Sequence, residues 1–528
     1  MLQIRRVLSV LAIIAAGAIS SFAQVVNVIP YPQMVELSEG ICKVSQLKRL
    51  SFDSSLKSEA CYLADKLSVH GVNLTMKEDC RPAARTILLQ VDDSLPSEGY
   101  VMKVGNREIT VAGGSEAGVF YAIQTMLQQI DAGELRCGTI IDSPRYPWRG
   151  LMLDEARHFF GIERVKQIID MMAYYKLNKF HWHLTDASGW RLEINSWPLL
   201  TTVGGIGSHS DPQSPAAFYT QAQIREIIDY AATRHIEVIP EIDMPGHASA
   251  ATKAYPQFSG GGRSQDRDGF TFNVGKEETY SFLTDVLEEV KSLFPSEYLH
   301  IGGDEVSHGN SEWKTDEHIQ GLIQKHDLKD IQGAERYFMQ RMIDTVKVLD
   351  RKVIAWDEII EHDVDRNNTI VMWWRHNKPD FLVKSLSDGF TTILCPRHPM
   401  YFDFKQHDTH KLGPKWKVVN TSESIYSFPD STIDPLGLAD QQLKNIAGIQ
   451  ANIWTEYIHN DERFDYMVYP RICFFAESAW TNKENKDYDS FTERMENAYE
   501  LFDSMDIYYF DVRDPERRPE VAIPVIKN

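Results

Sequence analysis

Two adjacent carboxylates, Asp304 and Glu305, are the residues best suited to chemistry in this chain, and they directly follow Gly302 and Gly303. A positioned carboxyl group can donate a proton and later take one back. We expect the charge of Asp304 to help raise the pKa of Glu305, because like charges disfavour ionisation. An isolated Asp-Glu pair is usually a solvated turn, and two glycines can form a strand bulge. The pair therefore needs support from the rest of the chain.

Similar polar or aromatic residues follow the other apolar segments of the same region, always at the C-terminal end of the segment. Each group taken singly could be structural. The same polarity at the same end of eight consecutive segments is not expected from packing, so we predict an active site there. In chain order the residues are Asp154, Glu155, Arg157 and His158; His181, His183 and Asp186; Glu241, Asp243 and His247; His300 with the acid pair; Trp356, Asp357 and Glu358; Trp373 and Trp374; Tyr401, Phe402 and Asp403; and Gln450, Asn452, Trp454 and Glu456.

Eight strands with helices between several of them must position these residues. Repeated βα units predict a (β/α)8 TIM barrel, whose active site lies at the C-terminal ends of its strands. A doubly wound open sheet is the alternative, but no G-x-G-x-x-G or P-loop follows a first strand. The expected strands are Arg149–Leu153, Lys179–Leu184, Glu237–Ile242, Tyr298–Ile301, Val353–Trp356, Ile370–Trp373, Thr392–Cys395 and Ala447–Ile453, and the clearest helices are Ile162–Tyr175, Gln223–Thr233, Lys276–Leu293 and Gln332–Leu349.

The composition of the expected pocket indicates a sugar. Carboxylates accept hydrogen bonds from hydroxyl groups, Arg157 can donate them, and Trp or Tyr rings can cover the C–H faces of a sugar ring. Retaining glycosidases generally hold two carboxyl groups about 5–5.5 Å apart, on either side of the scissile bond. Asp304 and Glu305 are neighbours in the chain and cannot easily reach both faces of a sugar. The nucleophile can then belong to the substrate, for example a 2-acetamido oxygen.

The first residues are interpreted as a secretory signal peptide, residues 1–23. Arg5 lies in a short basic segment, Leu8–Ile19 is apolar, and Ala23 is a small residue at the expected cleavage point. The apolar run is shorter than the roughly 20 residues of a membrane-spanning helix. We therefore expect a secreted or periplasmic protein.

The pattern of apolar and polar residues changes within the mature chain and indicates two domains. Alternating segments such as Arg85–Val91 and Glu108–Val111, followed by a helical stretch at Ala117–Ile130, predict a small α+β domain before the barrel. Pro144 and Pro147 mark the boundary. The predicted divisions are residues 24–143 for the α+β domain, 144–485 for the barrel, and 486–528 for a C-terminal helical extension and tail.

Composition and charge narrow the partners. Of the 528 residues, 43% are hydrophobic and 25% charged, which is typical of a globular protein. The formal net charge of −20 disfavours nucleic acid and anionic lipid as partners. No later segment is apolar enough to span a bilayer, so no stable membrane insertion is expected. Six cysteines in no zinc-binding spacing leave open both disulfides and free thiols. The oligomeric state is not predicted.

These motifs resemble glycoside hydrolase family 20, the β-N-acetylhexosaminidases, over most of the mature chain. The segment His300 to Glu305 is similar to the catalytic motif of that family. Trp148-Arg149-Gly150 with Asp154 and Arg157 is similar to its first barrel strand. Further matches are His181 to Trp190, Asp243 to His247, and Gln450 to Glu456. The resemblance implies a small α+β domain before a TIM barrel, and substrates that are glycans with β-linked N-acetylhexosamine.

The resemblance also implies roles for individual residues. Glu305 would be the general acid and base, and Asp304 would hold the acetamido N–H and stabilise a charged intermediate. Tyr401 would donate to the acetamido oxygen. Trp356, Trp374 and Trp454 would form the walls of the pocket, although the adjacent Trp373 could take the place of Trp374. Sugar hydroxyls would be bound by Arg157, Asp403 and Glu456. The supporting groups would be Asp186, Asp243, His247 and His300, of which Asp186, His247 and His300 are also expected at the substrate.

One departure from the family pattern and two rival functions remain. The family usually has Asp-Gln after the aspartate that matches Asp186, and this chain has Ala187-Ser188. A metal-dependent hydrolase is the first rival, because His181, His183, His247, His300 and Asp304 could hold zinc. A sugar-binding protein without activity is the second. No cofactor or metal is expected. Treatment with a chelator tests the metal-dependent hydrolase, and turnover of a glycoside tests the inactive sugar-binding protein.

Overall fold

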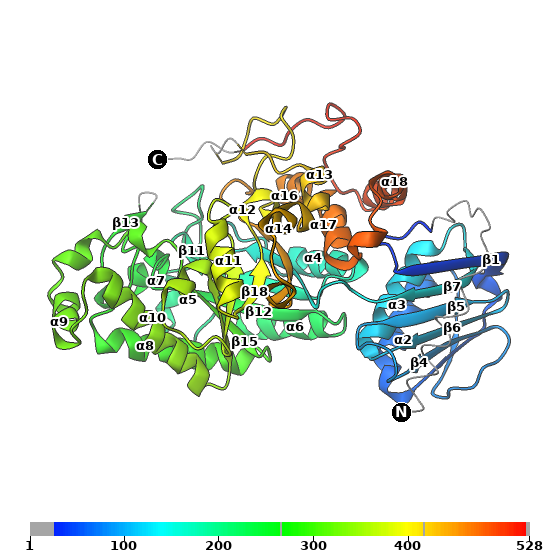
Figure 1. Cartoon of the computed structure of the whole chain (residues 1–528), viewed down its shortest axis with the longest axis horizontal. Helices are drawn as coiled ribbons and strands as arrows, with labels where there is room; N and C mark the ends of the chain where they lie inside the picture. The colour runs from blue at the N-terminus through cyan, green and yellow to red at the C-terminus, as the bar shows by residue number, and fades with distance from the viewer. Residues whose placement is uncertain (1–25, 265–266, 415–417, 524–528) are drawn as a thin grey trace.

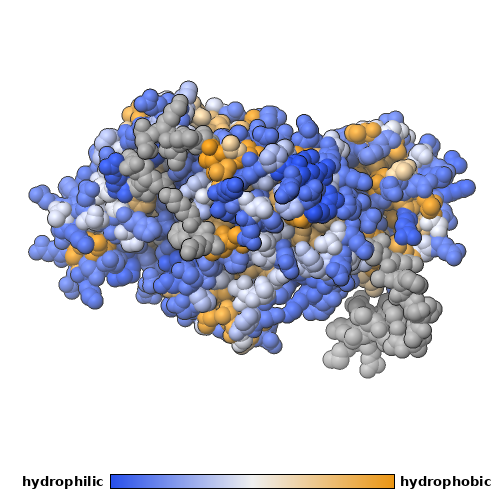
Figure 2. All heavy atoms as spheres, turned by 90° about the horizontal axis from the view of Figure 1, so that it is seen from above, coloured by the Kyte–Doolittle hydropathy of each residue, from blue (hydrophilic) through white to orange (hydrophobic). Residues whose placement is uncertain are grey.

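The computed structural model describes residues 26–264, 267–414 and 418–523. The predicted signal peptide lies outside the described residues. Two parts follow one another, a sheet domain and a barrel, with a C-terminal helix packed beside them (Figure 1). No helix in the described ranges is long and apolar enough to cross a membrane. The face of the molecule in Figure 2 is mostly hydrophilic, with small separate apolar areas.

The N-terminal part is a seven-stranded sheet in the order β1-β7-β5-β6-β4-β2-β3. Helix α3 (Glu116–Gln129) is buried from Gly118 to Met126, because it lies between the sheet and the barrel. On its barrel side the ring of Tyr121 packs 5.1 Å from that of Trp480. The bounds are Met34–Lys43 (β1), Arg49–Phe52 (β2), Thr75–Lys77 (β3), Thr86–Val91 (β4), Tyr100–Val104 (β5), Glu108–Gly113 (β6), Glu134–Asp142 (β7) and Lys57–Val69 (α2).

The second part is a closed barrel of eight parallel strands in the order β12-β15-β16-β17-β18-β19-β8-β9. This confirms the TIM barrel and all eight expected strands, and it excludes the open sheet. Apolar side chains such as Ile239, Ile354 and Met372 fill the barrel interior. The strands are β8 (Trp148–Asp154), β9 (Lys179–His183), β12 (Glu237–Met244), β15 (Tyr298–Gly302), β16 (Lys352–Trp356), β17 (Thr369–Trp373), β18 (Thr391–Leu394) and β19 (Ile446–Ile453).

Amphipathic helices cover the outside of the barrel. Helix α6 begins at a capping box in which Thr220 and Gln223 satisfy each other's backbone N–H groups. The four expected helices are present as α4 (Ile162–Tyr174), α6 (Gln221–Ala232), α8 (Glu277–Leu293) and α10 (Ile331–Val348). The others are α5 (Leu199–Thr202), α7 (Ser249–Ala254), α9 (Glu317–Lys325), α11 (Pro379–Ser387), α12 (Arg397–Met400), α13 (Ser422–Ser427), α14 (Asp430–Ile433), α15 (Asp440–Leu443), α16 (Asp461–Val468) and α17 (Arg471–Trp480). Two short hairpins pair β10 (Thr185–Asp186) with β11 (Gly189–Trp190), and β13 (Arg263–Ser264) with β14 (Arg267–Asp268).

Buried ion pairs join the sheet domain to the barrel. Arg149 of β8 is fully buried and pairs with Glu98 of the sheet domain at 2.8 Å. Lys176, also buried, lies 3.1 Å from the carboxylate of Asp142 at the end of β7. The indole N–H of Trp480 donates to the same Asp142 carboxylate at 3.0 Å. Because each charge is paired and hydrogen-bonded, the interface can exclude water.

The C-terminal helix α18 (Tyr488–Ser504) packs on the barrel through apolar residues and one buried ion pair. Arg494 of this helix lies 2.6 Å from Glu477 of α17. The six cysteines, all in described segments, are free thiols, and those at positions 42, 137, 395 and 473 are buried. Of the two possibilities left by the sequence, the structure has free thiols.

Candidate active site

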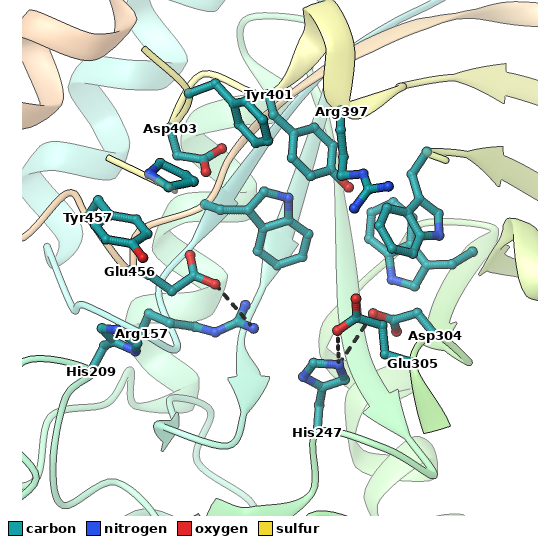
Figure 3. A pocket seen from close by; sticks show the side chains of 15 residues that line it. Arg157, His209, His247, Asp304, Glu305, Arg397, Tyr401, Asp403, Glu456 and Tyr457 are labelled. Atoms are coloured by element: carbon teal, nitrogen blue, oxygen red, sulfur yellow. Dashed lines mark ion pairs between the residues drawn. The ribbon is translucent and has the colours of Figure 1, made fainter. Parts of the chain in front are cut away.

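A cavity of about 460 Å³ opens at the C-terminal ends of the barrel strands (Figure 3). Acidic groups lie on two sides of it, with aromatic rings between them. Most of the predicted site residues line this cavity, and they are Arg157, His247, Asp304, Glu305, Trp356, Trp374, Tyr401, Asp403, Trp454 and Glu456. Residues separated by about three hundred positions in the chain therefore meet in one site.

The acid pair follows β15 in an unusual backbone conformation. Gly302 and Gly303 have φ angles of 68° and 93°, and Glu305 itself has a φ of 53°. Any side chain on Gly302 would collide with the carboxylate of Asp243. A left-handed conformation at a glutamate is strained, and surrounding structure must hold it in place. The strained turn carries both carboxyl groups into the cavity.

Glu305 lies between two imidazoles and is 34% exposed. Its Oε2 atom lies 3.8 Å from Nε2 of His247 and 3.5 Å from Nδ1 of His308. Burial acts to raise the pKa of Glu305, but the hydrogen bond from His308 and the charge of His247 outweigh it, so that the pKa is lowered. The expectation of a raised pKa for Glu305 was therefore wrong. The two imidazoles act more strongly on this carboxyl than its neighbour Asp304 does.

Asp304 is the member of the pair whose pKa rises. Burial is the main cause, the charge of His247 opposes it, the charge of Glu305 adds to it, and the pKa is about 6. One carboxylate oxygen, Oδ2, lies 3.4 Å from His247. The other, Oδ1, is buried without a hydrogen-bond partner among the described residues. A buried acceptor without a donor is costly, so this oxygen is ready to accept an N–H or O–H of a ligand.

Asp186 is a buried carboxylate that contacts residues on both sides of the site. Its carboxylate lies 2.8 Å from Arg157 and 3.1 Å from His247. Burial would raise the pKa of Asp186, but these two cations hold it well below its usual range. The same carboxylate helps raise the pKa of His247 to about 9, against the effect of burial. His247 is thus held as a cation beside the acid pair.

Asp186, Asp243 and His300 do not line the cavity. Asp186 and His300 are buried, and their predicted contact with the substrate stays a prediction. Burial, followed by the charge of Asp304, raises the pKa of Asp243 well above its usual range. Asp243 supports the turn that carries the acid pair, because its carboxylate packs directly against Gly302.

Glu241 is the centre of a buried network under the cavity. It accepts from His183 and from the indole N–H of Trp356 at 2.9 Å, and it lies 3.0 Å from His181 and from His300. This network fixes the orientation of Trp356. Side chains in the described ranges that could share a metal ion form three groups, which are His181, Glu241 and His300; His183, Asp186 and Asp243; and Asp243, His247 and Asp304. The donors of the zinc hypothesis are divided among these groups.

Aromatic rings form one continuous wall. The ring of Trp454 lies 6.0 Å from Trp356 and 6.0 Å from Tyr401. Trp374 lines the cavity and donates to Glu358 at 3.0 Å. Trp373 is buried in the core and donates to a backbone carbonyl at 3.2 Å. The question left by the adjacent tryptophans is thus answered in favour of Trp374.

The wall opposite the acid pair carries Arg157, Asp403 and Glu456 (Figure 3). Arg157 lies 3.6 Å from Glu456 and stacks 5.0 Å from the ring centre of Trp454. Burial raises the pKa of Asp403 well above its usual range and also raises the pKa of Glu456. Groups of this kind suit hydrogen bonding to sugar hydroxyls.

Sequence reasoning missed several residues of the cavity. Tyr457 and Phe404 directly follow predicted residues, so extending those motifs by one position would have found them. His209, Arg397 and Pro414 lie outside any motif in the long connections, and only the folded structure brings them to the site. His308 was missed although it stands one turn after Glu305.

A parallel barrel with acid–base groups, hydroxyl-binding groups and aromatic rings in one terminal cavity defines the class of glycoside hydrolases. The family model for the glycosyl hydrolase family 20 catalytic domain matches residues 146–483, and that for domain 2 of this family matches residues 25–143. The chain therefore belongs to glycosyl hydrolase family 20.

Known relatives agree with this assignment. A beta-hexosaminidase of Porphyromonas gingivalis is 33% identical over 92% of this chain, which spans 64% of the length of that relative. A beta-hexosaminidase of Vibrio furnissii is 34% identical, over 87% of this chain and 77% of that protein. The crystal structure of the GH20 exo β-N-acetylglucosaminidase of Vibrio harveyi with N-acetylglucosamine superposes with a TM-score of 0.85 at 31% identity, covering 95% of this chain and 80% of the other.

Proposed function

We propose that the protein removes terminal, non-reducing β-linked N-acetylhexosamine, either GlcNAc or GalNAc, from oligosaccharides or glycoconjugates. The observation that carries the proposal is the acid pair, in which Glu305 faces the cavity beside an unpartnered oxygen of Asp304. Glu305 can donate a proton, and the free oxygen of Asp304 beside it can accept an N–H. This arrangement matches a sugar whose 2-acetamido group lies next to the bond that breaks. The named activities of the relatives support the same substrate class.

We assign nucleophilic attack to the acetamido oxygen of the substrate. Its oxygen bonds to C1 while Glu305 passes its proton to the departing glycosidic oxygen, which leaves a positively charged oxazolinium ring. Water then loses a proton to Glu305 and attacks C1 from the vacated side, which restores the acetamide and retains the configuration. Asp403 and Glu456 face the pair across the cavity, so they are the carboxylates that a trapping experiment must test as alternative nucleophiles.

The other residues act on charge and position in this scheme. Asp304 accepts the acetamido N–H and stabilises the cationic ring, Tyr401 donates to the acetamido oxygen, and the tryptophans enclose the N-acetyl group. Glu305 must be protonated before the first step. A sugar that fills the cavity removes water from this carboxyl, and desolvation raises a carboxyl pKa.

A panel of aryl β-glycosides with and without the 2-acetamido group tests the function and its mechanism together. We expect rapid hydrolysis of the acetamido sugars and almost none of the matched 2-hydroxy sugar, which lacks an internal nucleophile. A 2-fluoroglucosyl adduct trapped on Glu456, Asp403 or another carboxylate would refute substrate assistance. Loss of activity with EDTA and recovery with Zn²⁺ would favour the metal hydrolase, and sugar binding without turnover would favour a binding protein.

We further propose that the protein is exported and acts outside the cytoplasm. The basic and apolar segments at the start of the chain support this. Fractionation of the producing cells, followed by N-terminal sequencing, should recover a chain that begins at Gln24 outside the cytoplasm. Recovery of the full chain in the cytoplasm would contradict the proposal.

A further inference from the structure

His209 lines the active-site cavity, but the proposed reaction does not use it and no motif predicted it. It lies in the long connection between α5 and α6. Figure 3 shows it beside Arg157, on the side of the cavity that carries Glu456. Because this side is the one expected to bind sugar hydroxyls, an imidazole here is a candidate sugar ligand.

Both ring nitrogens of His209 are open to a ligand. Neither forms a hydrogen bond with another described residue, and neither is closed off from solvent. The ring packs against that of His158, with 6.3 Å between the ring centres. A sugar that fills the cavity displaces water from the imidazole. A ring nitrogen without a partner would then be left unsatisfied, which is costly, so a sugar that offers a hydroxyl at this place is favoured.

The imidazole of His209 can both donate and accept. Burial, followed by the charge of Arg157, lowers the pKa of His209 to about 4. The ring is therefore neutral near pH 7, and one nitrogen donates while the other accepts. A guanidinium such as that of Arg157 only donates, and an ionised carboxylate only accepts. His209 consequently adds to this wall a group that can bond a hydroxyl in either direction.

The backbone around His209 is fixed by hydrogen bonds to residues around the site. The N–H of His209 donates to the carbonyl oxygen of Arg157 at 2.7 Å. The carbonyl of the preceding residue accepts from the guanidinium of Arg267 at 2.6 Å. The hydroxyl of the next residue, Ser210, lies 2.7 Å from Nε2 of His158. Because this segment is already ordered, the imidazole can bind a sugar with little further loss of conformational entropy.

The position of the acid pair indicates which part of the sugar reaches His209. In the proposed reaction Glu305 acts at C1 and Asp304 holds the 2-acetamido group. A pyranose ring carries O3, O4 and O6 away from these two positions, and this part of the sugar faces the opposite wall. We propose that His209 binds one of these three hydroxyls and makes the enzyme selective for sugars that carry it. The inference rests on the proposed function for the identity of the sugar.

A double-mutant cycle between His209 and the sugar tests the contact. His209→Phe keeps a ring against His158 but removes both nitrogens. The kcat/KM of an aryl β-N-acetylhexosaminide is compared with that of its 3-deoxy, 4-deoxy and 6-deoxy analogues in both proteins. We expect the variant to lose roughly tenfold to a hundredfold on the parent sugar. One deoxy analogue should lose a similar factor in the wild type and almost nothing more in the variant, because the same contact is already absent.

His459→Phe is the matched control. The ring of His459 also packs 6.3 Å from that of His158, but this residue does not line the cavity. The control should leave kcat/KM unchanged for the parent and for every analogue. His209→Ala repeats the cycle with no aromatic ring to accommodate. An unchanged kcat/KM in the folded His209 variants, or an equal loss on the parent and all three analogues, would show that His209 only supports the loop and would overturn the proposal.

Calorimetry separates this inference from the proposed function. Titration of the wild type and the His209 variants with free N-acetylhexosamine and its deoxy analogues gives the same cycle from binding constants, without turnover. Hydrolysis without coupling to any hydroxyl would refute only the role of His209. Sugar binding that shows the coupling, without hydrolysis, would refute only the proposed function. A protein that neither hydrolyses nor binds these sugars would refute both.

Discussion

Nδ1 of His308 lies 3.5 Å from Oε2 of Glu305, one turn further along the chain. The imidazole is largely exposed, and its pKa is raised first by the hydrogen bond to Glu305. The carboxylate of Glu305 therefore favours the protonated form of His308. The same oxygen of this carboxylate lies 3.8 Å from Nε2 of His247.

Replacing His308 by Gln should move the alkaline limb of the kcat/KM profile to higher pH. The cation lowers the pKa of Glu305, so without it the opposing effect of burial raises that pKa, and Glu305 stays protonated to higher pH. The limb in kcat/KM is the relevant one because it reports groups of the free enzyme. His318→Gln, at an exposed histidine of α9, is the control and should leave the profile unchanged. A limb that stays in place in the folded His308 variant would separate this histidine from Glu305.

Glu305→Gln should lower kcat by roughly 10²–10⁴-fold, the usual contribution of general acid–base catalysis. Binding of the N-acetylhexosamine product should change little, because the amide keeps the size of the carboxyl group. Turnover of aryl glycosides and calorimetry with the free sugar measure the two effects. Activity within a few-fold of the wild type would mean that another group supplies the proton.

Asp304→Asn should lower kcat by roughly 10²–10³-fold, because an amide removes the charge that stabilises the cationic intermediate. A thiazoline analogue of the cyclised sugar should inhibit the wild type strongly and the variant much less. The melting temperature should stay close to that of the wild type, because Asp304 has a raised pKa and one unpartnered oxygen. Equal inhibition of both proteins would argue against contact between Asp304 and the intermediate.

Asp142→Asn should destabilise the whole chain by about 3–5 kcal/mol, because it leaves the buried cation of Lys176 without its partner. The midpoint of urea unfolding, followed by tryptophan fluorescence, measures the change. Asp93→Asn, at an exposed loop of the same domain, is the control and should shift the midpoint very little. An unchanged midpoint in the Asp142 variant would show that water reaches the domain interface.

The barrel could be predicted from the sequence because its strands are local apolar runs with a repeated polar end. The eight expected strands agree with the structure to within two residues at each end. Helix α10 was expected at Gln332–Leu349 and spans Ile331–Val348, a shift that depends on Asp330, whose side chain caps the helix by accepting from Gly333. A regular spacing of apolar residues was therefore enough to predict each strand and helix. The exact end of a helix depends on its capping residue.

The electrostatics of the site could not be predicted in the same way. The pKa values of Asp304 and Glu305 depend on His247, which is 57 positions away, and on the φ of 53° that turns Glu305 toward His308. Neither relationship is visible in the sequence.

The bond from Trp480 to Asp142 joins residues 338 positions apart, and that from Tyr31 to Glu477 joins residues 446 apart. A ribosome makes the sheet domain first and α17 almost last. The interface between the sheet domain and the barrel therefore cannot form during most of synthesis. Asp142 has no indole donor until Trp480 has been made. The sheet domain is made first, but its contacts with the barrel can form only after α17 has left the ribosome.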